Sequence, residues 1–111
     1  MEKIQDNKKR LQAIKKNMIS DTEIYEISDF FKIFGDSTRL QILWALDGNK
    51  LTVTELCQIL GMTKSAISHQ LRSLKDNKLV AYRKQGKNTI FELDDEHVSM
   101  IIETARRHLK E

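Results

Sequence analysis

Two short amphipathic segments joined by a tight turn constrain the fold of this chain more than any other feature. Residues 52–60 and 64–76 each place apolar side chains on one face at helical spacing: Val53, Leu56, Cys57 and Leu60 in the first, and Ile67, Leu71 and Leu74 in the second. Thr52 and Thr63 suit the N-cap position of the two helices, and Gly61 suits a left-handed C-terminal position between them. The pattern predicts a helix-turn-helix.

Helices precede this motif. Helical spacing of apolar residues predicts three of them, at 3–18, 22–34 and 37–46. Asp36 or Ser37 can cap the third helix. We expect that helix to bury Leu40, Leu43 and Trp44.

A hairpin and a last helix follow the motif. Residues 79–85 and 88–93 have the pattern of two strands, and Gly86 in the "QGKN" turn can adopt a positive φ. The last helix begins near Asp94 or Asp95. This order predicts a winged helix-turn-helix, a mainly α fold with a small β-hairpin.

Length and composition indicate one domain in a reducing compartment. A chain of 111 residues buries only a modest core, so a partner subunit could add to it. Because no run approaches the roughly 20 apolar residues of a membrane span, we expect no membrane partner. The N-terminus has no apolar signal segment, and the single cysteine, Cys57, cannot form an internal disulfide. We therefore expect a cytoplasmic protein.

Positive charge is concentrated in the second half of the helix-turn-helix and in the hairpin. Residues 63–90 hold seven basic residues against one acidic residue, Asp76. The flanking segments 21–47 and 91–111 each hold six acidic residues, against two and three basic residues respectively. A basic segment between acidic ones is typical of a surface that faces a polyanion. On charge alone, a solvated face with lysines for solubility explains the pattern equally well.

The segment 64–76 has the residues of a helix that contacts DNA. Ile67, Leu71 and Leu74 should pack inward, which leaves the opposite face to Ser65, Ser68, His69 and Arg72. Small hydroxyl side chains allow close approach to the major groove, and His and Arg reach base edges or phosphates. Lys64 lies at the helix N-terminus, where the backbone also favours phosphate. In the hairpin, the residues suited to backbone phosphates are Arg83, Lys84 and Lys87.

Three stretches resemble the ArsR/SmtB family of bacterial metal-responsive repressors: "FFKIFGDSTRLQILWAL", "AISHQLRSLKDNKLVAYRKQGKNTIFEL" and "DDEHV". The resemblance covers about residues 21–111. It departs at Ser37, where many relatives have proline. It implies a winged-helix homodimer on an imperfect palindromic operator, with DNA contacts from Lys64, Ser65, Ser68 and His69. We expect residues 1–20 to form a basic N-terminal arm or helix, and residues 21–111 the DNA-binding and dimerisation domain with a C-terminal sensor helix.

Polar pairs stand at both ends of the closing helix. His97 and His108 are eleven residues apart, so they face the same way but lie about 16 Å apart along the axis. One chain therefore offers two half-sites, Asp95 with His97 and His108 with Glu111. An antiparallel copy of this helix would complete two equivalent sites, each with two imidazoles and two carboxylates. The seam between the copies would be apolar: Val98, Ile101, Ile102, Ala105 and Leu109.

The residues alone leave a plainer interpretation open. Asp95 could be only an N-cap, and His108 and Glu111 only surface residues. The family resemblance implies instead that Asp95, His97, His108 and Glu111 are the zinc ligands on the C-terminal helices. The cysteines of a second family site are missing, because Thr52 occupies the place of the motif cysteine. Zn(II) is therefore the expected effector, and Co(II) suits the same donors.

These patterns predict a zinc-responsive transcriptional repressor whose metal-free homodimer binds operator DNA. Two alternatives stay open: a DNA-binding regulator with a structural zinc or another effector, and a winged-helix module that binds protein. The sequence has no nucleophile–base pairing and no Gly-rich phosphate loop. We therefore expect no enzymatic activity.

Overall fold

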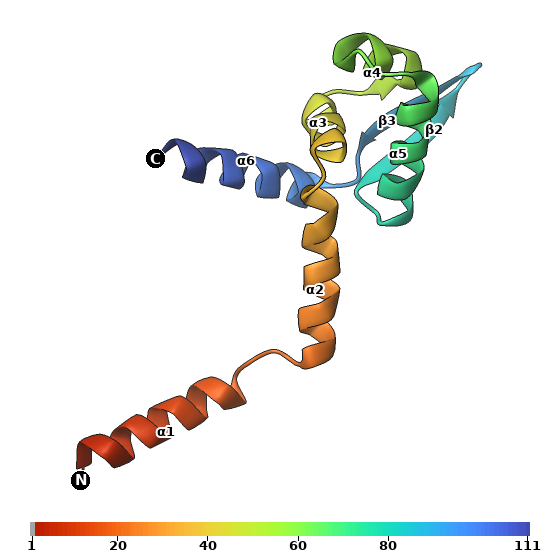
Figure 1. The fold of residues 1–111 in the computed structure, drawn as a ribbon. Helices are drawn as coiled ribbons and strands as arrows, with labels where there is room; N and C mark the ends of the chain where they lie inside the picture. The colour runs from red at the N-terminus through yellow and green to blue at the C-terminus, as the bar shows by residue number, and fades with distance from the viewer. Residues whose placement is uncertain (1) are drawn as a thin grey trace. The chain divides into compact units, whose positions relative to one another are not determined.

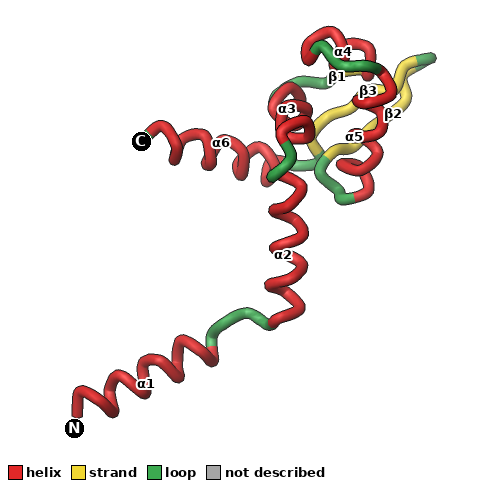
Figure 2. The backbone as a smooth tube through the Cα atoms, in the orientation of Figure 1, coloured by secondary structure: helices red, strands yellow, loops and turns green. Residues whose placement is uncertain are grey.

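The computed structural model describes residues 2–111 and has the predicted winged helix-turn-helix architecture (Figure 1). Its elements are α1 (Glu2–Lys16), α2 (Asp21–Phe34), α3 (Ser37–Leu46), β1 (Leu51–Thr52), α4 (Val53–Leu60), α5 (Lys64–Asp76), β2 (Val80–Gln85), β3 (Asn88–Leu93) and α6 (Glu96–Lys110). Two compact units are present, one ending at Phe31 and the other running from Lys32 to Glu111. All the elements of the helix-turn-helix and the hairpin belong to the second unit (Figure 2). No helix over residues 2–111 is long and apolar enough to cross a membrane.

The predicted hairpin forms, and it pairs with a short strand that the sequence pattern did not indicate. The three strands are antiparallel in the order β1-β3-β2. The β2–β3 register runs from Val80 opposite Leu93 to Gln85 opposite Asn88, and Gly86 takes a φ of 63° in the turn. Strand β1 has only two residues, which is too short for an alternating pattern to reveal.

The helix-turn-helix begins and ends at the predicted residues. Thr52 and Glu55 form a capping box, since Thr52 Oγ1 accepts from Glu55 N at 3.2 Å and Glu55 Oε1 accepts from Thr52 N at 2.9 Å. Gly61 ends α4 in the left-handed conformation, with φ 66°. Thr63 then caps α5, its Oγ1 accepting from Ala66 N at 3.2 Å. The turn therefore caps both helices, because Gly61 N donates to the carbonyl of Cys57 in α4 and the Thr63 side chain accepts from the first turn of α5.

Replacing Thr63 by alanine should destabilise the fold by about 0.5–2 kcal/mol, because the first turn of α5 loses its side-chain acceptor. The midpoint of urea denaturation, followed by circular dichroism, measures this change. Thr54→Ala is the matched control, since Thr54 is an exposed residue in the first turn of α4 and not its cap. Equal shifts in the two variants would contradict a capping role for Thr63.

The core of the second unit is built from its helices and from strand β2. Side chains with at most 2% exposure come from α3, α4, α5, the loop after α5, and β2: Ile42, Leu43, Leu46, Leu56, Ile67, Leu71, Leu74, Leu79 and Val80. The first turns of α6 complete it with Val98 and Ile102, each 4% exposed. The inward face of α5 is thus the predicted one, whereas on the predicted face of α4 only Leu56 is buried and the other three residues are half-buried.

The prediction of the buried face of α3 was wrong for two of three residues. Leu43 is buried, but Leu40 is 38% exposed and Trp44 is 40% exposed. Ile42 and Leu46 face the core in their place. The second half of α3, residues 42–46, is a continuous apolar run that covers all sides of the helix, so its sequence specifies no single face, and the packing of its neighbours decides which residues are buried.

The predicted apolar seam of α6 also needs correction. Val98 and Ile102 are buried in the core of their own chain, so they are not free to form a seam between copies. Toward the C-terminus the helix leaves this core, and Ala105 and Leu109 are exposed, Leu109 at 85%. The surface of α6 open to a partner is therefore its C-terminal half.

Candidate DNA interface and metal half-sites

Helix α5 presents the predicted polar face to solvent. Its apolar residues Ile67, Leu71 and Leu74 are at most 1% exposed, which fixes the rotation of the helix about its axis. The opposite face is exposed, and five of its side chains line one shallow depression: Lys64, Ser65, Ser68, His69 and Arg72. The structure thus brings together every residue of α5 that the sequence singled out for DNA contact.

A hydrogen bond that the sequence did not indicate connects α5 to α3. Arg39 Nε on α3 donates to Gln70 Oε1 on α5 at 3.1 Å, and both residues are half-buried. The backbone of Arg39 is held in turn, because its N donates to the N-cap carboxylate of Asp36 at 2.9 Å. The orientation of the polar face of α5 therefore depends on α3 as well as on the core.

The three basic residues of the hairpin stand apart from the α5 depression. Arg83 and Lys84 lie on β2 opposite Ile90 and Thr89, and Lys87 follows Gly86 in the turn. All three are exposed. The hairpin runs past α5 to a tip beyond the helices (Figure 1). The three cations are therefore placed to contact a polyanion next to the part of it that would lie against α5.

The first predicted half-site lies at the start of α6. Asp95 is the N-cap, and its Oδ1 accepts from His97 N at 2.9 Å. His97 Nδ1 lies 3.4 Å from the same oxygen, and both side chains are open to solvent, at 76% for His97 and 49% for Asp95. Ligands at about 2.0–2.1 Å from a tetrahedral zinc are themselves roughly 3.3 Å apart. The capping hydrogen bond and the approach of His97 Nδ1 both involve Oδ1 of Asp95, whose distance from Nδ1 is close to that between two zinc ligands.

The second predicted half-site lies at the other end of the same helix. His108 and Glu111 are exposed, and Glu111 N donates to the carbonyl of His108 at 3.3 Å. A cation is favoured here, because the carbonyl groups at a helix C-terminus carry partial negative charge. Residues 2–111 contain no cluster of three or more potential ligands within one chain. A four-ligand site therefore needs donors from a second copy.

Two contacts tie α6 to α3. Ser99 Oγ donates to Asp47 Oδ1, at the C-terminal cap of α3, over 2.7 Å. Farther along α6, the guanidinium of Arg106 lies 5.2 Å from the ring centroid of Trp44. These side chains connect the helix that carries both half-sites to the helix that braces α5.

Comparison with known proteins places the chain in a family. Residues 36–82 match the model for "Bacterial regulatory protein, arsR family". The transcriptional repressor SmtB homolog of Synechocystis sp. is 31% identical over 102 residues, which cover 92% of this chain and 77% of that protein. The chain belongs to the ArsR/SmtB family of bacterial transcriptional regulators.

Two further comparisons agree with this membership. The cadmium resistance regulatory protein CadC homolog of Staphylococcus aureus is 36% identical to this ArsR/SmtB chain, over 78% of it and 72% of the relative. The crystal structure of the AntR antimony-specific repressor superposes with a TM-score of 0.76 at 29% identity, covering 85% of this chain and 86% of that one. These relatives are transcriptional regulators, which confirms that the ArsR/SmtB chain is not an enzyme.

Proposed function

We propose that this ArsR/SmtB chain is a zinc-responsive repressor: its metal-free homodimer binds a palindromic operator, and Zn(II) held between the α6 helices lowers its affinity for DNA. The observation that carries the proposal is the Asp95–His97 pair, whose donor atoms are 3.4 Å apart at one end of a helix that carries His108 and Glu111 at the other.

The DNA-binding part of the proposal rests on the two basic, exposed surfaces of the second unit. Lys64, Ser65, Ser68, His69 and Arg72 gather on one face of α5. The hairpin adds Arg83, Lys84 and Lys87 as backbone contacts. A family of transcriptional regulators provides the context, and several of the related proteins are repressors.

The metal part rests on the chemistry of the donors. Two imidazoles and two carboxylates form an N/O set that suits Zn(II), and Co(II) fits the same donors. The relatives named for cadmium and antimony point to softer ions, which prefer thiolate ligands. This chain has a single cysteine, Cys57, which lies half-buried on α4. We therefore favour Zn(II) over those ions.

A bound ion would be held by four donor side chains and would link two antiparallel α6 helices. In this arrangement Asp95 and His97 of one copy face His108 and Glu111 of the other. The α6 helices would then hold a fixed position relative to each other. Their contacts with α3, through Asp47 to Ser99 and Trp44 to Arg106, would carry that constraint to the braced α5. Operator binding would weaken because the two α5 helices no longer match successive major grooves.

Binding to DNA with and without zinc tests this function. The metal-free protein first selects DNA from a random pool, and fluorescence anisotropy then gives its affinity for the selected duplex. We expect affinity to fall steeply as salt rises and to fall about 5–150-fold when zinc is added. Unchanged affinity on adding zinc would remove zinc as the effector. Absence of salt-dependent binding would remove DNA as the ligand and favour a protein-binding module.

A structural role for zinc is the second candidate, because both half-sites lie on a surface that a second copy would cover. Size-exclusion chromatography of the metal-free protein distinguishes the two roles. A regulatory ion requires a metal-free dimer at the concentrations at which DNA is bound. A metal-free monomer that dimerises only with zinc would favour the structural role.

A further inference from the structure

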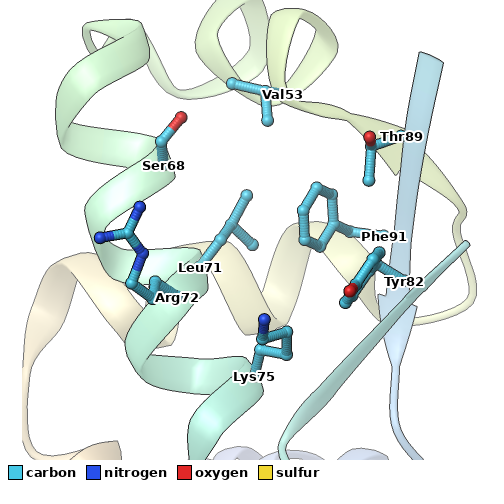
Figure 3. Close-up of a pocket in the computed structure, with 8 residues that line it drawn as sticks. All are labelled: Val53, Ser68, Leu71, Arg72, Lys75, Tyr82, Thr89 and Phe91. Carbon is cyan, nitrogen blue, oxygen red and sulfur yellow. The ribbon is translucent and has the colours of Figure 1, made fainter. Parts of the chain in front are cut away.

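A groove that the sequence did not indicate runs between α5 and the hairpin (Figure 3). Its floor is apolar, formed by Val53, Leu71 and Phe91, and its polar lining comes from both sides. From α5 come Ser68, Arg72 and Lys75, and from the hairpin come Tyr82 and Thr89. Lys75 lies three residues after Arg72 and seven after Ser68, so it extends the polar face of α5, and the folded hairpin shows what lies opposite it.

Lys75 is held at this groove by an aromatic side chain. Its Nζ lies 5.0 Å from the ring centroid of Tyr82, a distance at which the ring attracts the ammonium group. The ring of Tyr82 is supported by Phe91, with centroids 6.0 Å apart and planes tilted by 36°. Figure 3 shows Lys75 reaching from α5 toward this pair. The contact with Tyr82 therefore positions the ammonium group of Lys75 over the groove.

The groove is continuous with the DNA face of α5. Ser68 and Arg72 line both the groove and the depression that contains Lys64 and His69. In duplex DNA, one sugar–phosphate strand separates each major groove from the neighbouring minor groove. If α5 occupies the major groove and the hairpin lies at the neighbouring minor groove, the sugar–phosphate strand between the two grooves must pass between α5 and the hairpin. An apolar floor with a cationic rim matches a deoxyribose and its phosphate.

We propose that this groove holds one sugar–phosphate unit of the operator backbone in each subunit, with Lys75 contacting the phosphate and Tyr82 acting as a positioning residue for Lys75. This inference rests on the proposed DNA-binding function and adds residues that it did not include. Such a contact raises affinity for any sequence and fixes the register of α5, but it does not discriminate between bases.

The salt dependence of Lys75→Gln tests the phosphate contact. A dimer of this variant loses two phosphate contacts, so the plot of log affinity against log salt should be shallower by about 1.8, and affinity at 0.15 M salt should fall about 30-fold. The loss should be equal for selected and unrelated DNA. Lys50→Gln is the control, because it removes the same charge from another part of the surface. The Nζ of Lys50 lies 3.6 Å from Glu92 Oε2. The slope of this variant should equal that of the wild type.

Tyr82 variants test the positioning role through the same slope. Tyr82→Phe keeps the ring and should keep the wild-type slope, whereas Tyr82→Leu should make it shallower. In a Lys75→Gln background, Tyr82→Leu should change the slope no further. Steep salt dependence that is the same in wild type and Lys75→Gln would overturn this inference alone. Absence of salt-dependent binding by the wild type would instead overturn the proposed function.

Discussion

Replacing His97 by alanine should leave the DNA affinity of the metal-free protein unchanged and abolish the loss of affinity caused by zinc. The side chain is 76% exposed at the start of α6 and belongs to neither the core nor the face of α5. Its removal takes one donor from each shared site, and the remaining three bind zinc less tightly. The coupling between zinc and DNA, expected at about 1–3 kcal/mol, should fall to nearly zero in anisotropy titrations.

The three histidines of the chain supply matched variants for this experiment. His108→Ala should reproduce His97→Ala, because the two residues belong to the same sites in the proposed dimer. His69→Ala should do the opposite. It should weaken DNA binding, roughly tenfold, with and without zinc, and leave the coupling ratio intact. Loss of metal-free DNA binding in His97→Ala or His108→Ala would show that these residues serve the fold and not the response to zinc.

Replacing Ile67 by alanine should lower the free energy of unfolding by about 2–5 kcal/mol, because it leaves a cavity beneath α5. Ile67 has 0% exposure and lies on the face of α5 opposite the residues that we expect to contact DNA. Single domains are stabilised by only about 5–15 kcal/mol, so the loss is a large fraction of the total. Urea denaturation followed by circular dichroism measures it.

Ile59→Ala is the matched control for this variant. Ile59 lies on α4, the other helix of the same motif, but is 58% exposed. The same substitution there removes little buried surface, so the unfolding free energy should change by less than about 1 kcal/mol. Similar losses in the two variants would show that the inward face of α5 is assigned wrongly.

The helix-turn-helix and hairpin were predictable because their boundaries are set by local chemistry. Thr52 and Thr63 supply side-chain acceptors for the first turns of their helices, and Gly61 and Gly86 supply positive φ angles at low cost. These interactions span three or four residues, so they can be recognised without knowing the rest of the fold. The exposed polar face of α5 followed directly, since a clear apolar face defines the polar face opposite.

The closing helix was predictable in its residues but only partly in their surroundings. The spacing of His97 and His108 excludes a single-chain site on geometry alone, and the structure shows how Asp95 serves as an N-cap while its carboxylate lies beside His97. The spacing did not reveal that Val98 and Ile102 belong to the core of their own chain. Apolar periodicity shows which residues share a face, but not whether that face meets the same chain or a partner.

The order of elements, the ends of the helix-turn-helix and the polar face of α5 depend on interactions between near neighbours, so they can be derived from the sequence. Tertiary structure alone decided which side of α3 is buried, how Arg39 braces Gln70, and how Tyr82 meets Lys75. The physical reason is distance along the chain. The Arg39–Gln70 pair is separated by 31 residues, and such contacts exist only after several elements have packed, so no local pattern records them.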